Sequence, residues 1–188
     1  DVGWCVEIDP VSAEIMDYDN DGESDKLWAL GNLSHENISE PIGDTAVFFG
    51  EDNSIDSDNS CVFKFVADTP QDLSSGKLYT LVRDENDSTR ADWVLIPNGT
   101  KQEQEDITQA ANDVGAWNVP RVEDVEIGPH DGKVYVTSTT WNEIWRFDDK
   151  GDHVENLEIY VGSKSEYPVD SAGQSGKTVS WSNCDNLC

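Results

Sequence analysis

The sequence predicts an all-β protein built from β-propeller blades. Short stretches of alternating apolar and polar residues are separated by clusters of Gly, Asp, Asn and Ser, which is typical of strands joined by turns. Two segments also echo each other: TAVFFGED…CVFKFVAD…KLYTLVRD parallels EDVEIG…KVYVTST…EIWRFDD…LEIYVG. Repeated four-strand units of about 40 to 50 residues indicate propeller blades. Because each blade needs neighbours on both faces, the chain is interpreted as a segment of about two to three blades.

The elements follow from the alternation. One helix is expected at Gln102–Val114, because acidic residues at its start suit a helix N-terminus. The strands are expected at Gly3–Ile8, Leu27–Leu33, Thr45–Gly50, Cys61–Ala67, Lys77–Arg83, Trp93–Ile96, Asp124–Ile127, Lys133–Ser138, Glu143–Phe147 and Leu157–Val161.

These elements predict one partial propeller domain over residues 1–188. Its expected parts are the end of one blade (1–33), a second blade (34–96), a helical insertion (97–120), a third blade (121–165) and the start of the next blade (166–188).

The composition restricts the partners. The chain has 39 Asp and Glu against 12 Lys and Arg, which gives a net charge of −27. Such a charge argues against nucleic acid and anionic membranes, since both would be repelled. No apolar run approaches the roughly 20 residues of a membrane span.

The cysteines and sequons favour an exported protein, either extracellular or periplasmic. The four cysteines form no CxxC pair, so a zinc site is not indicated, and an even number suits disulfides. A disulfide between Cys5 and Cys61 is expected because both precede aromatic-rich strands in neighbouring blades. Four Asn-X-Ser/Thr sequons, at Asn32, Asn37, Asn86 and Asn98, support export.

An acidic loop near the N-terminus has the spacing of a calcium loop. Asp17, Asp19, Asp21 and Asp25 stand at positions 1, 3, 5 and 9, with glycine at position 6. Alternate carboxylates can converge on one Ca²⁺, and glycine permits the sharp turn. Position 12 lacks the usual glutamate, so a solvated acidic hairpin tip is the alternative.

Arg121 and Glu123 raise a separate question, because they lie two residues apart and so share one face at the start of a strand. In the plain interpretation, Arg121 pairs with one of the many surface carboxylates. His35 and Glu36 form another charged pair, and by itself such a pair is more often structural than catalytic.

Several motifs together resemble the PhoX-type alkaline phosphatases. They occur in order as GWCVEIDP, ALGNLSHE, VFFGED, VFKFV, GKLY, RVE and DNL. The resemblance implies an exported six-bladed propeller with a cluster of iron and calcium on its axis that cleaves phosphomonoesters. It also implies that Arg121 contacts the substrate phosphate and that Glu36, Glu123 and Asp185 bind metal. His35, Asp52 and Asn186 are expected to support these ligands.

The chain also departs from the family pattern. Val122 replaces a proline, and the family's cysteine ligand belongs to a Thr-Cys-Glu-Glu segment that would precede Gly3. The first hypothesis is therefore an incomplete segment of a metal-dependent phosphomonoesterase, completed by further blades or by other copies. The alternative is a non-enzymatic, calcium-stabilised extracellular propeller with a structural or assembly role.

Overall fold

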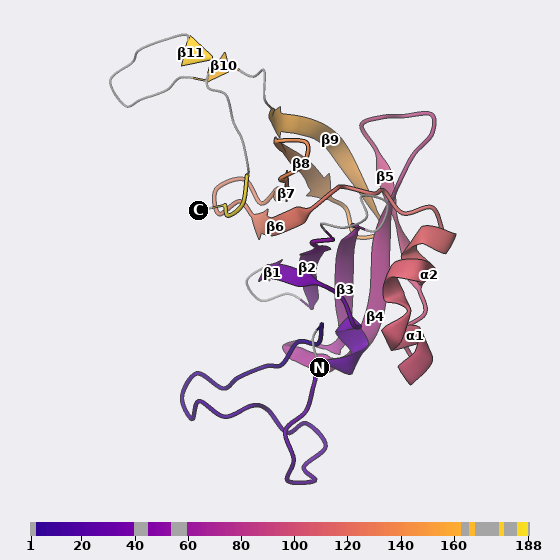
Figure 1. The fold of residues 1–188 in the computed structure, drawn as a ribbon, viewed down its shortest axis with the longest axis vertical. Coiled ribbons are helices and arrows are strands. Elements are labelled where there is room, and N and C mark those ends of the chain that lie inside the picture. Colours follow the sequence, from indigo (N-terminus) through magenta and orange to yellow (C-terminus); the bar gives the residue numbers. More distant parts are fainter. Residues whose placement is uncertain are drawn as a thin grey trace.

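The computed structural model describes residues 3–39, 45–53, 60–162, 166–167, 177–178 and 184–187. The fold is all-β, as predicted (Figure 1). Its strands are β1 (His35–Ser39), β2 (Ala46–Glu51), β3 (Val62–Thr69), β4 (Asp72–Arg83), β5 (Ala91–Ile96), β6 (Val122–Ile127), β7 (Val134–Ser138), β8 (Glu143–Asp149), β9 (His153–Val161), β10 (Glu166–Tyr167) and β11 (Lys177–Thr178).

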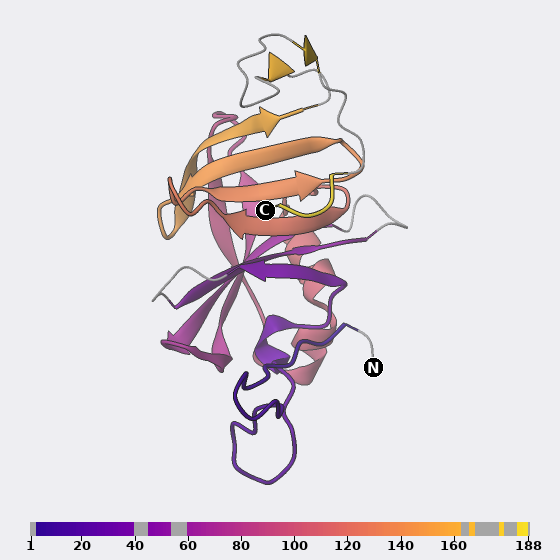
Figure 2. The same cartoon turned by 90° about the vertical axis from the view of Figure 1, so that its left-hand side faces the viewer.

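The nine strands β1 to β9 form two antiparallel blades. They are hydrogen-bonded in the order β1-β2-β3-β4-β5-β9-β8-β7-β6, and β5 joins β9 at only two residue pairs. From here on, β1–β5 are called the first blade and β6–β9 the second blade; they correspond to the predicted second (34–96) and third (121–165) blades. The sheet folds back on itself at the β5–β9 junction. Its two ends therefore meet, and β1 and β2 contact β6 (Figure 2). The short ladder of β10 and β11 stands apart, beyond β9 (Figure 1).

The two blades enclose an apolar core between them. Phe48 and Leu81 of the first blade lie in one buried cluster with Val125 and Phe147 of the second. The inner strands approach very closely at Gly50, where an added Cβ would lie 2.1 Å from Cγ1 of Val122. No other residue type fits there without moving one blade. This packing fixes the inner ends of β1, β2 and β6 relative to one another.

The outer face of the first blade is covered by helices and by the N-terminal segment (Figure 1). The single predicted helix is in fact two, α1 (Lys101–Glu105) and α2 (Ile107–Asp113). Thr100 and Glu103 form a capping box at the start of α1, and Asp106 leaves helical geometry with φ of −107°. The break lets Ile107 and Ala111 of α2 turn into the core. Among the described residues, no helix is long and apolar enough to cross a membrane.

Two strand predictions in the N-terminal segment are wrong. The stretch 3–8 makes a single β-bridge, between Ile8 and Ile15. Other segments of the protein donate backbone hydrogen bonds to only some of its carbonyls, so no continuous strand forms. The stretch 27–33 contains the 3₁₀ helix η1 (Trp28–Leu30) instead. Buried Leu27, Leu30 and Leu33 follow a spacing of three, which suits a helical turn and not alternation. The other eight predicted strands are confirmed as β2 to β9, although β4 begins five residues and β9 four residues before the predicted start. Strands β1, β10 and β11 were not among the predicted strands.

Candidate functional site

Arg121 lies immediately before β6, in an unusual backbone conformation. Its φ is +52°, a region that residues other than glycine rarely adopt. The backbone is held on both sides: the amide of Arg121 donates to Oγ of Ser60 at 3.3 Å, and its carbonyl accepts from the amide of Thr139 at 3.1 Å. Contacts with the first blade and with the end of β7 therefore fix the backbone position of Arg121, from which its side chain extends.

The inner end of the first blade supplies two further acidic residues. Glu36 is the second residue of β1, and Asp52 directly follows β2. His35 pairs with Glu51 across the two strands, and the amide of Asp52 donates to the carbonyl of Ser34 at 3.0 Å. This pairing places Glu36 and Asp52 side by side at the strand ends, on the side of the sheet that faces β6.

Three carboxylates from three strands converge beside Arg121. Glu36, Asp52 and Glu123 each offer an oxygen that lies within 4.8 Å of the oxygens of the other two. We call these three residues the carboxylate group. The sequence predicted that Glu36 and Glu123 would meet, and the structure brings them together. Asp52, expected only in a supporting position, joins them.

Arg121 makes ion pairs with two members of the group. Its Nε lies 3.1 Å from Oδ1 of Asp52, its terminal nitrogen lies 3.5 Å from Oδ2, and the same nitrogen donates to Oε1 of Glu123. The Arg121 side chain remains 35% exposed, whereas that of Glu123 is only 10% exposed. The guanidinium is therefore more exposed than the two carboxylates that it contacts, whereas Glu36 is itself exposed. Hydrogen bonding to Asp52 raises the pKa of Arg121, so it stays charged.

The surroundings disfavour negative charge on Glu36 and Glu123. Desolvation, followed by repulsion from Glu123 and Asp52, raises the pKa of Glu36. Desolvation and repulsion from Asp52 raise the pKa of Glu123, and Arg121 partly offsets this. Carboxylates that repel one another in a shared space are suited to a divalent cation, which would neutralise them. Their oxygen-only donor set fits a hard cation such as Ca²⁺.

Residues 184–187 return to the same end of the second blade. The hydroxyl groups of Thr137 and Thr139 donate to the carbonyls of Asp185 and Cys184. The side chain of Asp185 is exposed and accepts from Asn186 at 3.3 Å. It is close enough to raise the pKa of Glu36 and of Glu123, but it does not belong to the carboxylate group.

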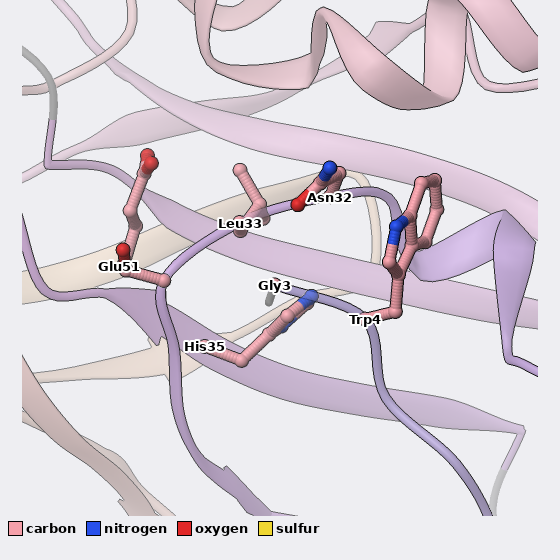
Figure 3. A pocket seen from close by; sticks show the side chains of 7 residues that line it. Gly3, Trp4, Asn32, Leu33, His35 and Glu51 are labelled. Carbon is pink, nitrogen blue, oxygen red and sulfur yellow. The ribbon is translucent and has the colours of Figure 1, made fainter. Parts of the chain in front are cut away.

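His35 lies on the opposite face of β1 from Glu36. It lines a separate cavity of about 450 Å³, together with Glu51 and the N-terminal residues Gly3 and Trp4 (Figure 3). Its Nε2 is 3.0 Å from the carbonyl of Gly31, and its ring packs on Phe49. Burial raises the pKa of Glu51 to about 7. His35 therefore has local structural partners and no contact with the carboxylate group.

Three of the four aspartates of the acidic loop come together. Oxygens of Asp17, Asp19 and Asp21 lie within 4.8 Å of one another. Gly22 has φ of +92°, and its amide donates to Oδ2 of Asp17 at 2.9 Å. Asp25 lies outside this group of three, because its carboxylate accepts from the amide of Tyr18 at 2.8 Å.

The expected disulfide is not formed, since Cys5, Cys61 and Cys184 are all free. Cys61 is fully buried, and its thiol lies 3.8 Å from Oδ1 of Asn118. Cys5 packs against the same apolar cluster from the N-terminal segment, and burial raises the pKa of both thiols. Both side chains therefore act as apolar packing. Cys188 lies outside the described residues.

Sequence reasoning missed a polar seam between the blades. Asn37 of β1 donates to Asp124 at 2.7 Å and to Glu126 at 3.1 Å, and Ser39 donates to Glu126 at 2.9 Å. Asp124 is 2% exposed, and its second oxygen accepts from the amide of Leu187. The signal was the spacing of two residues between Asn37 and Ser39 and between Asp124 and Glu126, which places each pair on one face of its strand. The seam aligns β1 with β6 and so positions the carboxylate group.

Comparisons with known proteins agree on one family. The model of the family "Alkaline phosphatase PhoX" matches residues 1–185. The solved structure of Pseudomonas fluorescens PhoX in complex with vanadate, a transition state analogue, is similar in fold, with a TM-score of 0.70 and 20% identity. That similarity covers 99% of this chain and 41% of the Pseudomonas protein, so the chain spans less than half of its length. None of the curated proteins compared with the chain matches it.

Proposed function

Because this chain belongs to the PhoX family of alkaline phosphatases, we propose that it carries phosphate- and metal-binding residues of a phosphomonoester hydrolase. The observation that supports this proposal is the meeting of Arg121 with the carboxylate group of Glu36, Asp52 and Glu123. A cation held next to a guanidinium is the arrangement that phosphate-transfer sites use to stabilise negative charge. The vanadate bound by the Pseudomonas relative fits a site of this kind.

Each residue has a separate part in the proposal. Glu36, Asp52 and Glu123 would hold the cation, which supplies charge neutralisation and polarisation of the phosphate oxygens. Arg121 would bind two phosphate oxygens with its planar fork. The backbone contacts of Arg121 with Ser60 and Thr139 orient that fork. Since the group consists of carboxylates, calcium suits it better than iron, and iron is expected from the family resemblance alone.

The proposal is tested by hydrolysis in the full-length protein. Metal-stripped protein is reloaded with Ca²⁺, alone and with iron, and phosphate release from p-nitrophenyl phosphate is compared with release from a phosphodiester. We expect metal-dependent hydrolysis of the monoester only. A folded, reloaded protein that cleaves neither ester, or that cleaves the monoester equally well without metal, would contradict the proposal. Export of the protein belongs to the same proposal, supported by the sequons and by membership of the PhoX family.

Calcium binding by the 17–25 loop is a further part of the proposal. Binding at 100 times Kd stabilises a folded protein by about 2.7 kcal/mol. Chelation should therefore lower the melting temperature by roughly 5 to 10 °C in a chain of this size. Asp19→Ala should remove most of the loop's contribution to this fall in melting temperature. The matched control is Glu23→Ala, an exposed acidic residue of the same loop outside the group of three. Equal chelator sensitivity in both variants would show that the loop is merely solvated.

A further inference from the structure

We propose that Arg121 is an internal cation that occupies the carboxylate group until a metal ion displaces it, so that Arg121 becomes available to phosphate only after metal has bound. This inference rests on the proposed function and concerns the order of events at the same site. It makes Arg121 a competitor of the metal as well as a partner of the phosphate.

The competition follows from the atoms that Arg121 uses. Its guanidinium contacts both oxygens of Asp52 and Oε1 of Glu123. The same two carboxylates, with Glu36, form the set whose oxygens lie within 4.8 Å of one another. A divalent cation would need these lone pairs, and the guanidinium offers only donors. Two positive centres that share the same oxygens repel each other at close range. Metal and Arg121 therefore compete for Asp52 and Glu123, while Glu36 stays open to the metal.

The structure allows the side chain to leave while the backbone stays in place. The backbone of Arg121 is fixed by Ser60 and Thr139, whereas its side chain is 35% exposed and lies on the solvent side of Glu123. Rotation of an exposed side chain takes picoseconds to nanoseconds and needs no change in the sheet. The freed guanidinium would remain tethered within one side-chain length of the metal.

The charges explain why phosphate must come last. In the metal-free state, three carboxylates and one guanidinium leave the site with net negative charge, which repels a phosphate dianion. A divalent cation brings the formal charge of the three carboxylates and the guanidinium from −2 to zero, and it leaves the displaced guanidinium free to contact phosphate. Metal binding therefore converts a site that rejects phosphate into one that accepts it. By linkage, phosphate must in turn strengthen metal binding by the same factor.

The test measures calcium affinity in the metal-stripped full-length protein by calorimetry, in an Asp19→Ala background that silences the acidic loop. A ligand's apparent affinity is reduced by the fraction of time for which its site is blocked. If the group is free of Arg121 about one-tenth of the time, Arg121→Met should bind Ca²⁺ about tenfold more tightly. Arg121→Lys, which keeps a charge but loses the fork, should lie between the two. Arg146→Met is the control, because Arg146 pairs with Glu158, outside the group.

A second arm titrates inorganic phosphate. We expect the metal-free protein to bind no phosphate and the calcium-loaded protein to bind it through Arg121. Unchanged or weaker calcium binding in Arg121→Met, no calcium binding at the group in any variant, or equal phosphate binding with and without calcium would each overturn the inference. The proposed function fails separately: tighter calcium binding in Arg121→Met without phosphomonoester hydrolysis by the parent protein refutes the hydrolase and leaves the competition intact.

Discussion

Arg121→Ala is expected to lower kcat/KM for phosphomonoesters about 10²- to 10³-fold in the metal-loaded full-length protein. The lost contact is a charged fork aimed at developing negative charge, and loss of one such donor costs about 2.7 to 4 kcal/mol of transition-state stabilisation. Nε of this guanidinium lies 3.1 Å from Oδ1 of Asp52, and the Arg121 side chain is 35% exposed, so a phosphate can reach it from solvent. Steady-state kinetics with p-nitrophenyl phosphate measure the effect.

The control for Arg121 is another arginine of the second blade. Arg146 pairs with Glu158 and lies over the ring of Tyr160, away from the carboxylate group, so Arg146→Ala should leave kcat/KM unchanged. The loss in Arg121→Ala should appear mainly in kcat, since a contact that strengthens in the transition state acts there. Equal kinetics for the two variants would reduce Arg121 to a surface ion pair, which is worth at most about 1 kcal/mol. Calcium affinity measured in parallel should rise in Arg121→Ala while turnover falls.

The sequence predicted the blades well because their signal is local. The stretches 61–67 and 133–138 are short runs rich in apolar residues between turn residues, so β3 and β7 were predicted to within two residues at each end, even though β3 is buried on both faces. Strand β1 was missed because His35, Glu36 and Asn37 present three consecutive polar residues. The hydrogen bonds that hold this strand in place, from Asn37 and Ser39, go to β6, which is remote in sequence. Local pattern contains no information on such a partner.

The site was predicted in part, for the same reason. Glu36, Glu123 and Arg121 came from motif resemblance, and the structure brings all three together. The inclusion of Asp52 depends on the register of β1 against β2, which the sequence does not reveal. The separation of His35 from the group follows from simple alternation along β1, since neighbouring residues point to opposite faces. The failed Cys5–Cys61 pairing shows the limit of inferring contacts from equivalent positions in neighbouring blades.

Lys64 joins the two blades at the end of the core far from Arg121. It extends from β3, and its ammonium lies 2.7 Å from Oδ2 of Asp149 and 3.0 Å from the carbonyl of Gly151. The Lys64 side chain is only 4% exposed, and it passes between the rings of Phe48 and Trp93. The indole of Trp93 donates to the other oxygen of Asp149 at 2.8 Å. One buried cation thus satisfies acceptors on the second blade while resting on aromatic rings of the first.

Lys64→Ala is expected to lower the free energy of unfolding by about 3 kcal/mol. Removing one partner of a buried ion pair costs about 3 to 5 kcal/mol, because the other charge stays behind uncompensated. We take the lower end because Asp149 is 24% exposed and keeps its bond to Trp93. Urea unfolding measures the change, and Lys101→Ala is the control. Lys101 pairs with Glu105 on an exposed helix face, where loss of the pair costs about 0.5 kcal/mol.

The double variant Lys64→Ala/Asp149→Ala separates the ion pair from packing. If its loss of unfolding free energy equals the sum of the losses in the two single variants, the ion pair does not couple the blades. The loss in Lys64→Ala then comes from packing on the aromatic rings alone.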